Sequence, residues 1–284
     1  YTPASSGDQV LRTLPDPKPT LRNGSFEESH GASQHSLFPW VQYAVAVDST
    51  GLHPIQGLVG PFAKAGPSSW FAGIRAYDGS YFVGAAASYE YKNGGVFQRV
   101  FATPGQAYTL SARYATHQIG GNDRDTRLRI GIDPNGGVDP NGAGVIWRSV
   151  FSPTNDAQWH VDAVTAVAGP AGVVTLFLDF RQQWPIEWHV AAVDDARFGP
   201  PLAMSIGTLK SCSSGVGAVL SAKTVTYVGL DTVVVDDKGY VKAYIEEDDA
   251  SSGIAVLFDQ NRSDQPLVGN KVTVTGSIVM HNME

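Results

Sequence analysis

The chain has 284 residues, of which 43% are apolar and only 17% are charged, so it is too apolar for a disordered protein and long enough for one large or two ordinary domains. A formal charge of −7 argues against a general affinity for nucleic acid or anionic lipid. No apolar run reaches the roughly eighteen residues that a membrane-spanning helix needs, so membrane insertion is not expected. The single cysteine, Cys212, has no partner for an intramolecular disulfide and is expected to be a buried thiol.

Residues 1–20 are rich in Ser, Thr and Pro and predict an extended N-terminal segment. The abrupt start at Tyr1 suits a mature N-terminus left by secretory processing, or a fragment of a longer protein. An extracellular or cell-surface location is therefore expected.

Residues 21–199 contain short stretches in which apolar and polar residues alternate, separated by turns rich in Gly and Pro. Alternation is clear in residues 108–116, 127–132 and 173–181, and no window longer than ten residues holds a helical period. Many short alternating strands predict an antiparallel β-sandwich.

The tetrad Asp-Pro-Asn-Gly occurs twice in residues 132–144, IDPNGGVDPNGAG. As a calcium loop of the EF-hand type this stretch fails, because its fifth position is Gly137 and its twelfth is Gly144 rather than Glu. Pro after Asp favours a turn, and Asn-Gly supplies positive φ. Two consecutive turns in a long loop are predicted.

A change in composition falls at residues 197–205, where Pro200 and Pro201 form a stiff spacer and beyond which no tryptophan occurs. Residues 203–284 hold six Lys or Arg against ten Asp or Glu, which disfavours binding of single-stranded nucleic acid. Strands are predicted at 216–228, 232–237, 241–249, 253–258 and 271–280. Five strands in so short a chain predict a small barrel of the OB type, with a twisted hairpin sheet as the alternative.

Three stretches carry a resemblance to a known family: N-x-x-F-E at residues 23–27, GGVFQRVFATPGQAYTLSARY at residues 94–114, and D-D-x-x-F at residues 194–198. Together they resemble the jelly-roll carbohydrate-binding modules that share the galactose-binding-like sandwich, over roughly residues 20–199. More loosely, AYIEEDDASSGIAVLF and VGNKVTVTGSIV resemble OB-like accessory domains of bacterial secreted proteins. The expected fold is therefore all-β, a jelly-roll sandwich over residues 21–199 followed by a small OB-like barrel over residues 203–284.

In that family the first and last strands are neighbours, and a structural calcium ion often joins them. The resemblance implies that Glu27 and one of Asp194 and Asp195 supply carboxylates to a Ca²⁺ ion. The alternative is that these acids form a surface pair and an Asx turn.

Sugar sites combine aromatic platforms with planar hydrogen-bonding groups, and residues 179–190, DFRQQWPIEWHV, supply this mixture. If the strands near 113, 129 and 181 share one sheet, its outer surface is a groove of charged side chains with tryptophans at its ends. The alternative places the tryptophans in the core and the charges in a solvated ion network. The candidate carbohydrate-binding residues are Trp70, Arg113, Arg129, Asp179, Arg181, Trp184 and Trp188.

No nucleophile elbow, zinc-protease motif, P-loop or dinucleotide fingerprint occurs, so no catalytic activity is expected. The favoured interpretation is a secreted, non-catalytic carbohydrate-binding module that attaches to a polysaccharide or surface glycan. The alternative is a self-assembling extracellular structural or filament subunit, in which the N-terminal segment of one copy completes an open sheet edge of another.

Overall fold

The computed structural model describes residues 20–28, 37, 39–44, 73–87, 89, 93–120, 126–148, 156–182, 186–210, 216–235, 238–261 and 265–278. Nearly all of its regular structure is β-strand, as the sequence predicts. Trp70, Trp184, Cys212 and the segment 1–19 lie outside the described residues. In the part that is described, no helix is long and apolar enough to cross a membrane.

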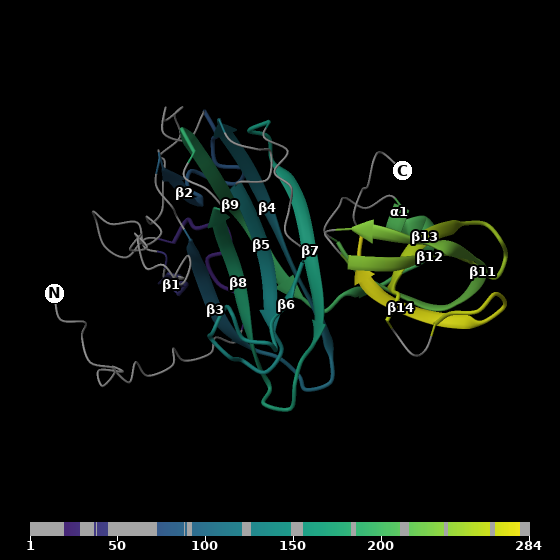
Figure 1. Ribbon diagram of the computed structural model, residues 1–284. Coiled ribbons are helices and arrows are strands. Elements are labelled where there is room, and N and C mark those ends of the chain that lie inside the picture. Colours follow the sequence, from purple (N-terminus) through teal and green to yellow (C-terminus); the bar gives the residue numbers. More distant parts are fainter. Residues whose placement is uncertain are drawn as a thin grey trace.

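Two antiparallel sheets form the first part of the chain and lie in separate layers (Figure 1). The five-stranded sheet has the order β1 (Val41–Ala44), β3 (Gly94–Phe101), β8 (Val173–Gln182), β5 (Thr126–Asp133) and β6 (Ile146–Trp147). The four-stranded sheet has the order β2 (Val83–Ala87), β9 (Trp188–Gly199), β4 (Ala107–Ile119) and β7 (His160–Val167). The predicted antiparallel β-sandwich is confirmed.

The core lies between these sheets and follows the alternation of the sequence. On β5 and β8 every second residue enters it, and on β4 the residues Leu110 and Ala112 face them from the other layer. Burying such an aliphatic side chain contributes roughly 1.5–3 kcal/mol, so these rows dominate the stability of the sandwich. The buried residues of β5 and β8 are Leu128, Ile130, Ile132, Val174, Leu176, Leu178 and Phe180.

The repeated Asp-Pro-Asn-Gly loop between β5 and β6 forms two turns, as predicted. In the first turn the Asp133 side chain accepts the N–H of Asn135 at 2.8 Å, and in the second the Asp139 side chain accepts the N–H of Asn141 at 2.9 Å. Each Asp carboxylate is thus engaged by the backbone of its own tetrad, which is the Asx turn expected from Asp before Pro.

The second part contains β10 (Leu202–Ala203), α1 (Ile206–Lys210), β11 (Gly217–Val235), β12 (Lys238–Glu246), β13 (Gly253–Asp259) and β14 (Lys271–Ser277). Strands β11, β12 and β13 form an antiparallel meander, β14 pairs with β11, and the short β10 runs parallel to β11. In Figure 1 this green and yellow unit lies to one side of the sandwich. The division between the two parts near residues 199–203 stays a prediction, although the change of sheet falls at that place.

Two expectations for the second part differ from the structure. The strands predicted at 216–228 and 232–237 are one continuous strand, because the chain at Gly229 makes a register shift instead of a turn. The OB barrel is not confirmed, since β13 and β14 do not pair with each other among the described residues and the helix precedes the long strand.

Candidate functional site

The outer face of the five-stranded sheet, turned away from the core, gathers aromatic rings and charged side chains. One cross-strand row runs Tyr43, Gly95, Asp179 and Arg129 over β1, β3, β8 and β5. The next row runs Val41, Phe97, Phe177, Gly131 and Trp147 over β1, β3, β8, β5 and β6. We call these two rows, together with Arg127 and Arg181 at the adjoining register position, the aromatic–arginine face.

Two glycines within the strands allow aromatic rings to lie on the sheet. A Cβ atom on Gly131 would come within 2.5 Å of the Trp147 ring, and one on Gly95 within 2.4 Å of the Tyr43 hydroxyl. Glycine in a strand interior weakens the strand and marks a place where another group approaches the backbone closely. Here the approaching groups are the two rings.

The four aromatic residues of this face pack in two levels. Phe177 and Phe97 are buried at the level of the sheet, with ring centroids 6.0 Å apart. Tyr43 and Trp147 are partly exposed and pack against Phe177 from opposite sides, at 6.0 Å and 5.6 Å between centroids. The rings of Tyr43 and Trp147 are therefore the aromatic surface that a ligand can touch.

Asp179 organises the charged groups of the face. Its side chain is fully buried, and its Oδ1 accepts hydrogen bonds from Arg181 Nε at 2.6 Å and from Arg129 Nε and Nη2 at 3.1 Å each. Its Oδ2 accepts the Tyr43 hydroxyl at 2.8 Å. Burial and the negative charge of Asp179 raise the pKa of Tyr43 well above its ordinary value, so the phenol stays protonated and donates.

Arg129 makes a second contact that connects the charged and aromatic groups. Its guanidinium carbon lies 4.1 Å from the centre of the Trp147 ring. Stacking on an aromatic face and pairing with a carboxylate together fix the guanidinium plane. About a fifth of the Arg129 side chain, 19%, and of the Arg181 side chain, 21%, remains exposed.

The structure brings three of the predicted carbohydrate-binding residues together, namely Arg129, Asp179 and Arg181, and separates two others from them. Arg113 and Trp188 belong to β4 and β9 of the four-stranded sheet, so the single groove that would have joined all five residues is wrong. Trp70 and Trp184 lie outside the described residues.

The two separated residues have partners of their own. Trp188 packs with Val190 against a small apolar cluster of the four-stranded sheet, which agrees with the alternative that it is a packing residue. Arg113 lies over the Tyr77 ring at 3.7 Å and pairs with Asp195 at 3.4 Å.

Two of the three predicted calcium ligands, Glu27 and Asp194, hold one backbone segment, residues 77–81. Glu27 Oε1 accepts the N–H groups of Ser80 at 2.8 Å and Tyr81 at 2.6 Å. Asp194 Oδ2 accepts those of Tyr77 at 2.8 Å and Asp78 at 3.0 Å, and its Oδ1 accepts the N–H of Asp195. Burial raises the pKa of Asp194 to about 7, an effect that these backbone N–H groups partly offset.

Hydrogen bonds and ion pairs already engage the three predicted calcium ligands. The Asp194 oxygens and Glu27 Oε1 accept backbone N–H groups, and Asp195 pairs with Arg113 and Arg197. No group of three or more His, Cys, Asp or Glu among the described residues could hold a metal ion. Whether a Ca²⁺ ion joins Glu27 to Asp194 or Asp195 is not tested by these contacts, and the ion stays a prediction.

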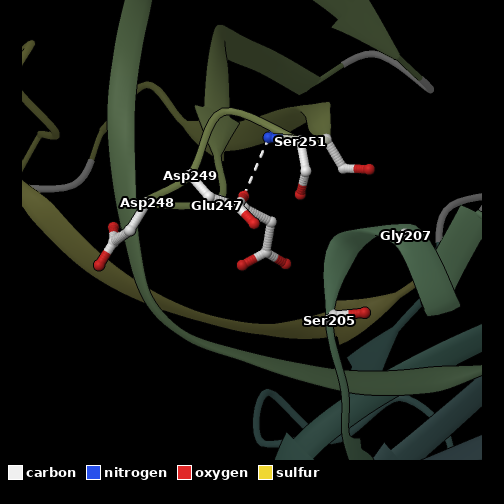
Figure 2. A pocket seen from close by; sticks show the side chains of 7 residues that line it. Ser205, Gly207, Glu247, Asp248, Asp249 and Ser251 are labelled. Carbon is white, nitrogen blue, oxygen red and sulfur yellow. Dashed lines mark hydrogen bonds between the residues drawn. The ribbon is translucent and has the colours of Figure 1, made fainter.

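A hollow of about 390 Å³ in the second part is lined by acidic and hydroxyl side chains. Figure 2 shows the Glu247 carboxylate pointing toward the start of α1, Asp248 pointing away, and Asp249 bonded to Ser251. Glu247 accepts the Ile206 N–H at 2.7 Å and pairs with Lys223 at 2.5 Å, while Asp248 pairs with Lys271. These contacts lower the pKa of both acids, and each of the two is paired with a lysine.

Tyr43 and Trp147 were not among the predicted site residues. They lie on strands of four and two residues, too short for alternation to reveal. A signal for them existed in Gly95 and Gly131, which interrupt otherwise regular strands and would have pointed to rings lying above them.

No protein-family model and no curated protein matches this chain. Among solved structures, it is similar to TmCBM61 in complex with β-1,4-galactotriose, with 16% identity, a TM-score of 0.44, and coverage of 64% of this chain and 99% of that one. A cyclase from Fischerella sp. TAU has 17% identity, a TM-score of 0.43, and coverage of 64% and 96%. The CBM22-1 xylan-binding domain of Paenibacillus barcinonensis Xyn10C has 13% identity, a TM-score of 0.35, and coverage of 65% and 97%.

Proposed function

We propose that this protein is a non-catalytic, secreted glycan-binding module and that the aromatic–arginine face is its binding surface. One observation carries the proposal: partly exposed Tyr43 and Trp147 lie on the sheet with the Asp179–arginine network next to them. Pyranose rings have an apolar C–H face that packs on aromatic rings and hydroxyls that bond to planar polar groups. The face offers both within two strand rows.

The charged groups favour binding over catalysis. Hydrolysis of a glycoside uses two carboxyl groups, one of them protonated or free to attack. On the aromatic–arginine face Asp179 is fully buried and held by two arginines and a tyrosine, so it cannot reach a glycosidic bond. Binding is the activity that this carboxylate supports.

The test is a screen of the intact chain against immobilised polysaccharides and a glycan array, followed by the variant Trp147→Ala. We expect retention on at least one glycan and a loss of affinity of tenfold or more in the variant, about 1.4 kcal/mol, because the variant lacks the exposed ring on which the sugar would pack. Trp159→Ala is the matched control, because Trp159 is a partly buried tryptophan that lies just before β7 and packs against an apolar cluster of the four-stranded sheet. Equal affinity of the two variants would reject the face as the site.

Self-association is the second candidate function, and β13 favours it. This strand pairs with β12 on one side, and no other described strand covers its second side. Exposed Leu257 lies on it, and an open sheet edge is a template for another chain. Fibres or rings in electron micrographs that disappear on deletion of residues 1–20 would support a filament subunit, and a monodisperse monomer would reject it.

A further inference from the structure

The aromatic–arginine face offers a ligand more hydrogen-bond donors than acceptors. This difference bears on the kind of glycan that the face binds. Asp179 accepts three N–H groups at Oδ1 and one hydroxyl at Oδ2. Oδ2 keeps a second lone pair, but the Asp179 side chain is fully buried, so a neutral sugar hydroxyl that approaches this face as a donor cannot reach it.

The donors of the face are in excess. A guanidinium has more N–H groups than one shared carboxylate accepts. Asp179 takes only Nε of Arg181, and the Nη2 atom of Arg181 is buried with no hydrogen-bond partner among the described residues. A buried donor without an acceptor costs about 1–3 kcal/mol, so Asp179 alone does not satisfy this guanidinium. A ligand reaches the two arginines through the exposed fifth of their side chains, 19% for Arg129 and 21% for Arg181.

The aromatic–arginine face is also positively charged, and positive charge, like surplus N–H donors, favours an anionic ligand. Arg127 pairs in register with Arg181, and Arg129 with Asp179, so these two adjoining pairs hold three arginines and one aspartate. On the following row Arg99 and Asp133 face each other across Thr175 and balance. The described residues of this face are thus net positive, in a chain whose overall charge is −7.

We infer that the ligand is an acidic polysaccharide, whose carboxylate or sulfate group accepts hydrogen bonds from Arg181 and Arg129 while its sugar ring packs on Trp147. This inference rests on the proposed glycan binding and adds the substrate class. An oxyanion has hydrogen-bond acceptors and no donors, so it matches the arginine N–H groups that this face offers. Because Asp179 and the Trp147 ring already hold Arg129, the oxyanion meets a fixed guanidinium plane.

The experiment compares matched polymers that differ only in the oxyanion. Polygalacturonate is measured against its carboxyl-reduced form, and a sulfated galactan against its desulfated form, by calorimetry with the intact chain at low and high NaCl. We expect one acidic member to bind about tenfold or more tightly than its neutral partner, with the gap narrowing as salt increases. The two pairs distinguish a carboxylate from a sulfate.

Variants locate the effect. Arg181→Ala should remove most of the preference for the acidic member, and Arg181→Lys, which keeps the charge without the planar fork, should retain only part of it. Arg113→Ala, on the other sheet, should leave the preference unchanged. An acid preference that survives Arg181→Ala and Arg129→Ala together would overturn the inference, because it would then arise from elsewhere on the chain.

Failure of the acidic-ligand inference and failure of the proposed glycan binding give different results. Equal binding of acidic and neutral members would overturn the acidic-ligand inference and leave glycan binding intact. Absence of binding to every polymer, with all variants folded by their unfolding curves, would overturn both.

Discussion

The hydroxyl of Tyr43 reaches the carboxylate of Asp179 at 2.8 Å although a whole strand, β3, lies between β1 and β8. The contact exists because Gly95 occupies the intervening position and has no side chain to block it. One hydrogen bond thus fastens the edge strand of the sheet to its centre, and the glycine beneath it is part of the same unit.

Replacing Tyr43 with Phe removes that donor and leaves one oxygen of a fully buried carboxylate without its partner. We expect the free energy of unfolding to fall by about 1–3 kcal/mol, measured by urea denaturation. Tyr89→Phe is the control, since Tyr89 is 66% exposed and should change the stability little. Equal stability of the two variants would show that Asp179 does not depend on the phenol.

Gly131→Ala places a methyl group against the Trp147 ring, which must then move off the sheet. We expect the glycan affinity to fall toward that of Trp147→Ala while the core, on the opposite face of the strand, stays intact. Tryptophan fluorescence reports the displacement of the Trp147 ring, and calorimetry with the glycan that the wild type binds best measures the loss of affinity. Gly199→Ala is the control, because nothing lies within 4 Å of its added methyl. A Gly131→Ala protein that binds the glycan like the wild type would exclude Trp147 as the ring on which the sugar packs.

Asp194 gives the stability a dependence on pH. Burial raises its pKa to about 7 in the folded protein, whereas the pKa of the unfolded chain is near the ordinary value of 3.8, so between these values the folded state holds a proton that the unfolded state has lost. The contribution of this group is therefore present in full below about pH 4 and is lost as pH rises to 7, by at most roughly 1.4 kcal/mol per pH unit.

The measurement for Asp194 is the unfolding free energy of the wild type minus that of Asp194→Asn, across pH 4 to 8. We expect this difference to decrease with rising pH, since the amide does not titrate. A difference that instead increases with pH would mean that the three N–H contacts outweigh burial and keep the carboxylate ionised.

The predicted calcium ion is tested by melting temperature in Ca²⁺ and in a chelator. If the ion binds, it stabilises the folded state by about 2.7 kcal/mol at a hundredfold excess over its Kd, and Glu27→Gln abolishes this effect. Glu28→Gln is the matched control, because Glu28 is half-exposed and pairs with Arg22. Equal melting temperatures of the wild type in calcium and in chelator would refute the calcium prediction. The role of Glu27 would then be to accept the backbone N–H groups of Ser80 and Tyr81.

The faces of the strands could be predicted from the sequence, but the sheets could not. Alternation in residues 127–132 and 173–181 separates core from outer positions, because each strand has one side against the other layer. It does not say which strands pair. Arg113 was grouped with Arg129 because both alternate with core residues, whereas β4 and β5, although consecutive, belong to opposite sheets.

The same limit explains the site. Asp179 and Arg181 lie two apart on one strand, so their shared face follows from periodicity alone, and pairing with Arg129 follows once β5 is the neighbour of β8. Tyr43 and Trp147 enter through β1 and β6, whose positions are set by contacts with distant strands. In the second part Gly229 looks like a turn, but the chain continues through it as one strand.

The burial of Asp179 has a consequence for the free-energy cost of binding a ligand. Ordering a long side chain when a ligand arrives costs about 0.5–1.5 kcal/mol for each one immobilised. Arg129 and Arg181 are already held by Asp179 before any ligand is present, so this entropy is lost during folding rather than during binding. A residue that no ligand can reach would therefore set how tightly the ligand is held, and its replacement would loosen two side chains at once.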